Sequence, residues 1–157
     1  MNSQPIVVGV DGTEFRDLAE NRAAAVTSAS LAEARVGAPA VRAVRSYLPP
    51  PPLWAGDVPP GELTTPESDA RERERLLDQL AGWREKYPEV RVEALVSHAG
   101  AAAVLVGVSR TAQLVVVGSR GHGAVAGTLL GSTGLQLIHH ADCPVLIARR
   151  SATGQGA

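Results

Sequence analysis

The sequence predicts an α/β fold: an open five-stranded parallel sheet in the order 3-2-1-4-5, with helices on both faces. Short apolar segments alternate with longer amphipathic ones along the whole chain, as repeated strand–helix–strand units require. Ile6 to Val10 and Leu114 to Val117 are apolar throughout and therefore suit central strands that are buried on both faces. With strands 1 and 4 adjacent at the centre, their carboxyl ends border a switch point, where a ligand crevice is expected.

The N-terminal half is expected to hold two strands and two helices around a long loop. The first helix is rich in alanine and ends at Gly37 and Pro39, which are usual stop signals. Seven prolines make Leu48 to Pro66 an extended surface loop, because proline fixes φ and lacks a backbone donor. The second helix has an apolar stripe of leucines and Trp83, and its charged run Arg71 to Arg75 is expected to face solvent.

The C-terminal half continues the alternation as far as a small, polar tail. Its apolar and amphipathic segments complete five strands and four helices, and residues 151–157 are expected to be disordered. Residues 1–150 are therefore predicted to form a single domain. The expected strands are Ile6–Val10, Val41–Tyr47, Arg91–Val96, Leu114–Val117 and Val145–Ala148, and the expected helices are Thr13–Val36, Glu67–Tyr87, Gly100–Thr111 and Ser132–His140.

Composition narrows the class of protein. The chain of 157 residues is 45% hydrophobic but only 3% aromatic, which predicts an aliphatic core. Its net charge of −1 argues against nucleic acid or an anionic membrane surface as the main partner. The single cysteine, Cys143, cannot form an intramolecular disulfide and is expected to be a small buried hydrophobe. Because no signal peptide and no membrane-span-length apolar window is recognisable, the expected compartment is the cytoplasm.

The glycine-rich run from Gly118 to Ser132, between an apolar strand and a helix, predicts a cradle for nucleotide phosphates. Glycine lets backbone N–H groups approach an anion closely, and the following helix N-terminus favours negative charge. Ser132 is expected to cap that helix and to offer its hydroxyl to a phosphate oxygen. Arg120 and His122 either neutralise phosphate charge or point to solvent, and the sequence does not decide between these readings.

Two common phosphate motifs are excluded. A Walker A loop needs a Gly-Lys-Ser/Thr sequence, and the only lysine is Lys86, on a predicted surface helix. A dinucleotide fingerprint would follow the first strand rather than the fourth. The glycines could instead merely shape a strand–helix turn, but their place at the switch point favours the cradle. Asp11, at the same edge, is read either as a ligand-facing acid or as a turn former before Gly12.

The spacing Gly118-x2-Gly121-x9-Gly131-Ser132 resembles that of the ATP-binding universal stress protein family. The flanking segments Asp142 to Ile147 and Ile6 to Thr13 are similar to that family as well, so the resemblance covers nearly the whole chain. It implies the same five-stranded parallel sheet, with ATP as ligand and Mg²⁺ or Mn²⁺ left open. It also implies a homodimer that pairs the last strand, Val145, Leu146, Ile147 and Ala148, edge to edge.

The resemblance also implies which residues meet the nucleotide. Asp11 would lie at the adenosine end, with Gly9 and Val10 lining the base pocket. Ser46 would meet adenine through its backbone, although Arg45-Ser46-Tyr47 lacks the apolar finish common in the family. The ribose contacts would fall on Val117 and Gly118, and the phosphate contacts on Gly121, Gly131, Ser132 and Thr133.

Three functions remain open at this point. The favoured one is a nucleotide-dependent regulatory or stress-response protein. The second is a dimeric interaction module of the same fold that binds no nucleotide. The third, an ATP-dependent enzyme, is disfavoured because no catalytic set of side chains can be assembled, so at most slow hydrolysis is expected. His98 is expected to be a solvated loop residue, and no metal site is predicted.

Overall fold

The computed structural model describes residues 4–10, 40–48, 66–119 and 131–148. The expected helix at Thr13–Val36, the proline-rich residues 49–65, residues 120–130 of the glycine-rich run and the C-terminal tail lie outside the described residues.

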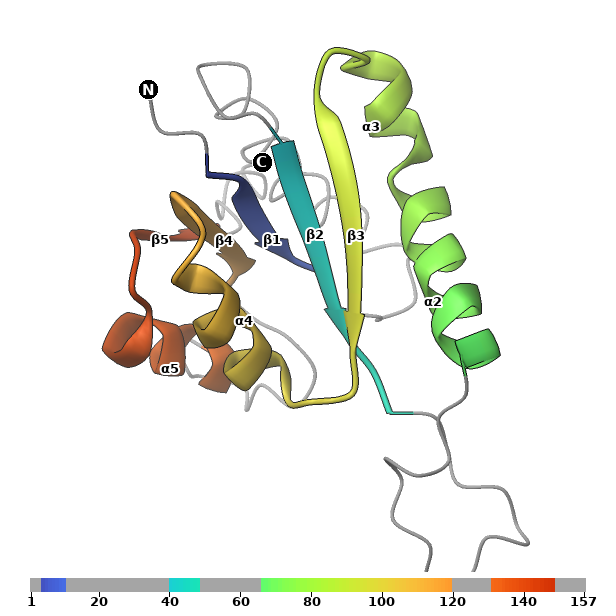
Figure 1. Cartoon of the computed structure of the whole chain (residues 1–157). Helices are drawn as coiled ribbons and strands as arrows, with labels where there is room; N and C mark the ends of the chain where they lie inside the picture. Colours follow the sequence, from blue (N-terminus) through green and yellow to red (C-terminus); the bar gives the residue numbers. More distant parts are fainter. Residues whose placement is uncertain (1–3, 11–39, 49–65, 120–130, 149–157) are drawn as a thin grey trace, which may run out of the picture.

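Five parallel strands form one sheet in the order β3-β2-β1-β4-β5, which confirms the predicted topology (Figure 1). Strands β1 and β4 lie at its centre, paired in register from Ile6 opposite Leu114 to Val8 opposite Val116. The strands are β1 (Ile6–Gly9), β2 (Ala40–Ser46), β3 (Arg91–Ser97), β4 (Leu114–Gly118) and β5 (Val145–Ala148).

Four described helices cover the two faces of the sheet. Helices α2 (Pro66–Gln79) and α3 (Ala81–Lys86) lie on one face, and α4 (Ala101–Ser109) and α5 (Ser132–His140) lie on the other (Figure 1). No described helix has the length and apolarity that crossing a membrane would require.

The single helix predicted at Glu67–Tyr87 is two helices, divided at Leu80. The Leu80 N–H lies 3.3 Å from the Leu76 carbonyl and 3.1 Å from that of Leu77, so the turn is tightened there. This tightening keeps Leu76 and Leu80 buried while Trp83 and Tyr87 still pack against the same core. The apolar stripe gives no sign of the break, because the stripe runs through it.

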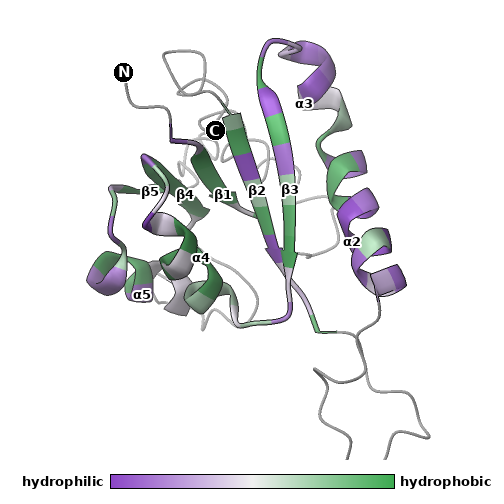
Figure 2. Ribbon diagram, in the orientation of Figure 1, coloured by the Kyte–Doolittle hydropathy of each residue, from purple (hydrophilic) through white to green (hydrophobic). Residues whose placement is uncertain are grey.

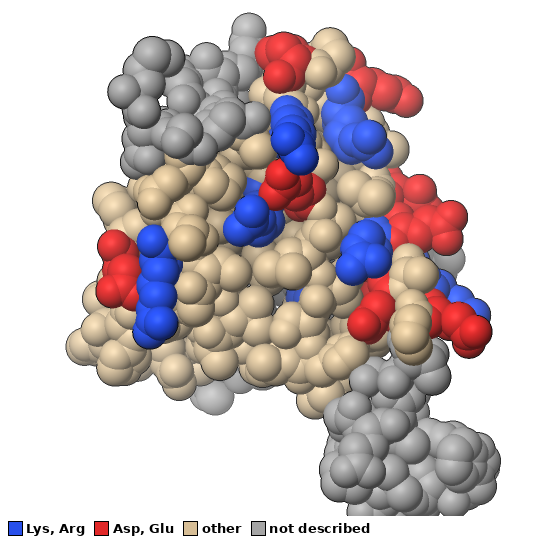
Figure 3. Space-filling model, viewed as in Figure 1, with Lys and Arg blue, Asp and Glu red and all other residues tan. Residues whose placement is uncertain are grey.

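The core consists of two aliphatic layers, one on each face of the sheet. Side chains alternate between the layers along each strand, so Val8 and Val116 pack with Leu76, whereas Val7 and Val115 pack with Leu105 and Leu137. In Figure 2 the central strands are apolar, whereas the outward sides of α2 and α3 are hydrophilic. Charged side chains accordingly gather along α2 and α3 in Figure 3, and the face over α4 is largely uncharged.

The carboxyl ends of the strands define the edge where a site is expected. β1, β2 and β4 all run toward this edge, and both α4 and α5 begin there. The Val10 N–H donates to the Val44 carbonyl at 2.9 Å, so β1 and β2 stay paired up to the point where β1 ends. Segments far apart in the sequence therefore meet at one edge, as the predicted switch point requires.

Candidate functional site

The N-terminus of α5 is joined to the end of β4 by a main-chain hydrogen bond. The Gly131 N–H donates to the Ser119 carbonyl at 2.9 Å, and the Ser119 N–H donates to the Ala148 carbonyl of β5 at 2.9 Å. The two ends of the glycine-rich run are therefore held together beside the central strand. The Gly131 carbonyl accepts the first helical hydrogen bond, from the Leu135 N–H at 3.1 Å.

The prediction that Ser132 caps α5 is wrong, because Gly131 occupies the cap position. Gly131 has φ −69° and ψ 162°, and no side chain of the described residues makes a capping hydrogen bond there. Ser132, the first residue of the helix, is exposed, and Thr133 is half-buried. The first N–H groups of α5 therefore lack a side-chain acceptor at the cap, and the helix dipole makes this end favourable for an anion.

Gly9 and Val117 lie side by side against α4. A Cβ on Gly9 would lie 3.1 Å from Leu105 Cδ1 and 3.2 Å from Val117 Cγ1, so glycine lets these side chains pack over the end of β1. Val117 is 4% exposed, whereas Val10 is half-buried and packs on the opposite face of the sheet. The buried Val117 side chain belongs to the core, and its backbone is the part that reaches the carboxyl edge with Gly118.

Ser46, at the end of β2, uses its hydroxyl within the protein. Its Oγ donates to the Ala99 carbonyl, in the turn between β3 and α4. The Tyr47 N–H donates to the Ser97 carbonyl at 2.9 Å, and the Ser97 hydroxyl accepts the Ala99 N–H at 3.2 Å. The Ser46 hydroxyl is therefore engaged within the protein, and the backbone is the part of Ser46 left for a ligand contact.

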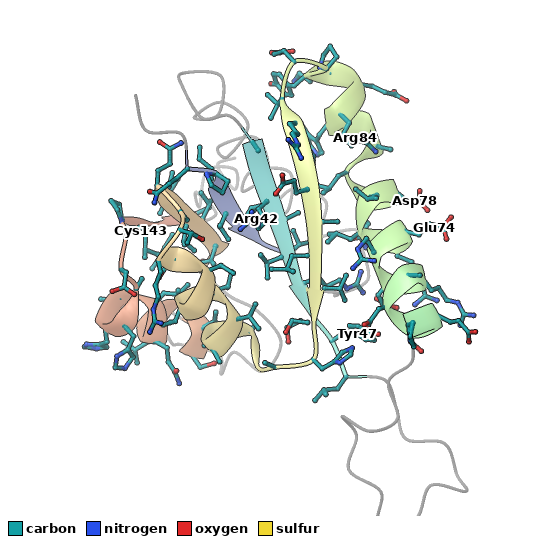
Figure 4. All side chains as sticks on the ribbon, in the orientation of Figure 1. Arg42, Tyr47, Glu74, Asp78, Arg84 and Cys143 are labelled. Atoms are coloured by element: carbon teal, nitrogen blue, oxygen red, sulfur yellow. The ribbon has the colours of Figure 1, made fainter. Side chains whose placement is uncertain are left out.

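Tyr47, Asp69 and His98 form a polar cluster at the same edge that the sequence did not predict. The Tyr47 hydroxyl donates to Asp69 Oδ1 at 2.7 Å, and His98 Nε2 lies 2.6 Å from the same oxygen. The Tyr47 and His98 rings meet edge to face, with 5.1 Å between centroids. Figure 4 shows Tyr47 at the end of β2, next to the start of α2. His98, expected to be solvated, is in fact paired.

The contacts of this cluster shift the pKa values of Tyr47 and Asp69. The hydrogen bond from Tyr47, followed by that from His98, lowers the pKa of Asp69 below 3.8. Burial, followed by the hydrogen bond to Asp69, raises the pKa of Tyr47 from 10.0 to about 12. At neutral pH the carboxylate of Asp69 therefore accepts from the protonated phenol of Tyr47. Because an ionised carboxylate only accepts, His98 must donate to it through Nε2.

A buried ion pair fastens α2 to β2 beneath this cluster. Arg45 Nη2 lies 3.2 Å from Glu72 Oε2, and each side chain is 11% exposed. Arg75, one turn along α2, is also paired with Glu72. Arg45 Nε and Nη1 have no hydrogen-bond partner within the described residues. The whole run Arg71 to Arg75 was expected to face solvent, and the burial of Glu72 corrects this expectation. The charges alternate along the run, so the sequence does not show that Glu72 turns toward the sheet.

Several predicted site residues cannot be placed. Asp11, Arg120, Gly121 and His122 lie outside the described residues. The structure brings the remaining predicted residues to the carboxyl edge in two groups, Gly9, Val10 and Ser46 on β1 and β2, and Val117, Gly118, Gly131, Ser132 and Thr133 around the end of β4. In the described ranges, no cluster of three or more histidine, cysteine or acidic residues could hold a metal ion.

Comparison with known proteins gives consistent matches. The model of the "Universal stress protein family" matches residues 2–149. A universal stress protein of Mycobacterium tuberculosis is 37% identical over 150 residues, which cover 94% of this chain and 46% of that protein. The chain thus spans about half the length of the curated relatives it matches.

Solved structures agree on the fold. The universal stress protein from Archaeoglobus fulgidus in complex with dAMP is 25% identical, with a TM-score of 0.62 over 94% of this chain and 98% of that one. A universal stress protein family protein from Arabidopsis thaliana, solved with AMP bound, is 19% identical, with a TM-score of 0.57 over 98% and 97% of the two chains, and supports the fold alone.

Proposed function

The chain belongs to the universal stress protein family, and on that premise we propose that it is a regulatory protein that binds an adenine nucleotide, ATP foremost. The observation that carries this proposal is the hydrogen bond from the Gly131 N–H to the Ser119 carbonyl, which joins the glycine-rich run to an α5 N-terminus without a side-chain cap. The complex of the Archaeoglobus fulgidus protein with dAMP adds support, because its ligand is an adenine nucleotide.

In the proposed complex the phosphates lie at the start of α5. The backbone N–H groups of Gly121, Gly131, Ser132 and Thr133 would donate to phosphate oxygens, with the dipole of α5 adding positive potential. Arg120 and His122 are proposed to neutralise part of the phosphate charge. Val117 and Gly118 would face the ribose through their backbone.

The base end is proposed to lie across the ends of β1 and β2. Asp11 would meet the adenosine, with Gly9 and Val10 beside the base and the Ser46 backbone in contact with adenine. The hydrogen bond between Val10 and Val44 supports this arrangement, because it brings the ends of the two strands together.

The nucleotide is proposed to act as a signal rather than as a fuel. Lys86 is the only lysine of the chain and lies on α3, at the opposite end of the sheet from the strand carboxyl ends (Figure 1). Its ammonium lies 5.4 Å from the Trp83 ring centroid and 5.3 Å from that of Tyr87. The proposed phosphate site therefore consists mainly of backbone donors and lacks a lysine ammonium. Such a site is better suited to holding a triphosphate than to fast transfer of its γ-phosphoryl group.

Calorimetric titration with ATP tests the proposal. Gly131→Ala is expected to weaken binding about tenfold or more, because the added Cβ keeps charge-assisted backbone hydrogen bonds from forming. The φ of −69° suits alanine, so the fold should persist. Gly82→Ala is the matched control, because a Cβ there meets nothing within 4 Å.

Three results would contradict the proposal. Absence of binding heat for the wild-type protein at millimolar ATP would exclude nucleotide binding and leave the dimeric interaction module. Unchanged affinity in the Gly131→Ala variant would show that the phosphates do not lie at α5. Rapid release of phosphate from the wild-type complex would contradict the regulatory role and favour an enzyme.

A further inference from the structure

The end of β2 is held by contacts from two other segments. On one face of the sheet, the Ser46 hydroxyl donates to Ala99 in the turn that follows β3, and within the sheet the Tyr47 N–H donates to Ser97, the last residue of β3. On the other face, the Tyr47 side chain reaches Asp69, in the first turn of α2. The main chain at Ser46 and Tyr47 is therefore fixed from both sides of the sheet.

Asp69 joins these contacts into one unit. Its Oδ1 accepts hydrogen bonds from both Tyr47 and His98, whose rings also touch each other. The three side chains come from β2, α2 and the turn between β3 and α4, so the cluster ties three elements together at the carboxyl edge. The Asp69 and His98 side chains are 35% and 28% exposed, which leaves the cluster open to titration and to substitution without creating a large cavity.

From this geometry we infer that Tyr47, Asp69 and His98, here called the polar clasp, are positioning residues for the base of the nucleotide. The inference rests on the proposed function. The clasp does not touch the ligand in this scheme; it fixes the backbone of Ser46, through which adenine is held.

A backbone contact makes such positioning necessary. A hydrogen bond weakens steeply as its angle or distance departs from the optimum, and the Ser46 side chain cannot compensate because its hydroxyl is already bonded to Ala99. The residues after Leu48 belong to the proline-rich segment, which offers few backbone donors to hold the strand end. The clasp supplies that restraint through side chains.

The test distinguishes contacts to the base from contacts to the phosphates. Affinities for ATP and for inorganic tripolyphosphate, which has no base, are measured by displacement of a fluorescent ATP analogue. Tyr47→Phe, which removes one hydrogen bond from the clasp, is expected to weaken ATP about five- to tenfold and to leave tripolyphosphate unchanged. His98→Leu should do the same, whereas His98→Gln, which keeps an N–H donor near the position of Nε2, should restore most of the ATP affinity.

Glu93→Gln is the matched control. Glu93 pairs with Arg42 at 3.1 Å across the same two strands, with similar exposure, but at their amino-terminal half (Arg42 is labelled in Figure 4). It should disturb the contact between β2 and β3 without changing either affinity.

The results that would overturn the inference about the clasp are distinct from one another. Equal losses for ATP and tripolyphosphate, or no loss of ATP affinity in Tyr47→Phe and His98→Leu, would overturn the inference while leaving nucleotide binding in place. A loss in Glu93→Gln as large as that in Tyr47→Phe would also overturn it, because any weakening of this strand pair would then suffice. If the wild-type protein binds no ATP, the proposed function fails and the inference fails with it.

Discussion

At the end of β2, one carboxylate oxygen of Asp69 accepts hydrogen bonds from both Tyr47 and His98. The pKa of Tyr47 reports on this arrangement. The neutral phenol donates a hydrogen bond to Asp69, whereas the phenolate would lie beside the negative charge of the carboxylate. Burial, followed by this hydrogen bond, raises the pKa of Tyr47 to about 12. The pKa of Asp69 is lowered below 3.8, because both of its partners donate to its ionised form.

The first prediction concerns the titration of Tyr47. In a Tyr87→Phe variant Tyr47 is the only tyrosine, and its phenolate absorbance should appear near pH 12. Adding Asp69→Asn should bring the midpoint down but keep it above 10.0, because burial, the larger cause of the shift, remains. A midpoint near 10.0 before the Asp69 substitution would show that the hydrogen bond is absent in solution.

The same shifts set the direction of the pH dependence of stability. Because the pKa of Tyr47 is raised on folding, its contribution to the free energy of unfolding is complete below pH 10.0 and is lost as the pH rises through about 12. Because that of Asp69 is lowered, its contribution is complete above pH 3.8 and is lost as the pH falls through the lower folded value. The clasp should therefore be intact throughout the neutral range.

Among the described helices, α2 is the one fastened to the sheet by a buried ion pair, Arg45 with Glu72. Leu76 on α2 and Leu80, just after it, pack against the core, while Glu72 carries its charge toward β2. Glu72 also pairs with Arg75, so a single carboxylate serves two guanidinium groups. Such a pair is costly to break from one side, because the remaining charge stays buried without a partner.

The second prediction follows for this element. Glu72→Gln should lower the free energy of unfolding by about 2–3 kcal/mol, slightly less than for a fully buried pair because both side chains retain some exposure. Glu93→Gln, which breaks the more exposed pair with Arg42, should cost less than about 1 kcal/mol. Urea denaturation of the two variants measures the difference, and equal costs would show that burial of Arg45 does not matter.

Elements with a simple apolar pattern were predictable, and those decided by contacts between distant residues were not. The unbroken apolar runs at Ile6 and Leu114 correctly indicated central strands, because burial on both faces leaves no room for polar alternation. The tightened turn at Leu80 and the burial of Glu72 depend on what α2 meets across the sheet. The clasp joins Asp69 to residues 22 and 29 positions away, a separation that no local spacing reveals.

The candidate site likewise has parts that the sequence predicts and parts that it does not. The glycine spacing indicated the correct strand–helix junction, since topology alone brings Gly118 and Gly131 to the switch point. The cap at Gly131 was misjudged because serine is a common cap residue, and only the backbone geometry shows that the helix begins at Ser132, one residue earlier than a Ser132 cap would place it. The contacts of Asp11, Arg120, Gly121 and His122 stay predictions.

For the molecule as a whole, β5 is the strand most suited to meet a second copy. In the described sheet it pairs with β4 alone, and Leu146 on it is 39% exposed. Leu135 and Ile138, on α5 beside it, are 51% and 53% exposed. We propose a homodimer through Val145, Leu146, Ile147 and Ala148, because pairing would satisfy the open backbone groups and cover apolar surface.

The third prediction tests this assembly. Light scattering after size exclusion should give the wild-type protein the mass of two chains, and Leu146→Lys should give one, because a charge on an edge strand disfavours pairing. Arg110→Ala is a suitable control, since Arg110 lies at the end of α4 with its side chain 74% exposed. A wild-type mass of one chain at high concentration would exclude the dimer.

The bond between Gly131 and Ser119 has a consequence for how this fold can change. This hydrogen bond joins the main chain just after β4 to the main chain just before α5, and it involves no side chain. It therefore does not depend on which residues lie between Ser119 and Gly131. Insertions, deletions and substitutions between these anchors should therefore be tolerated by the sheet. Changes there should accordingly alter the proposed phosphate contacts before they alter the sheet.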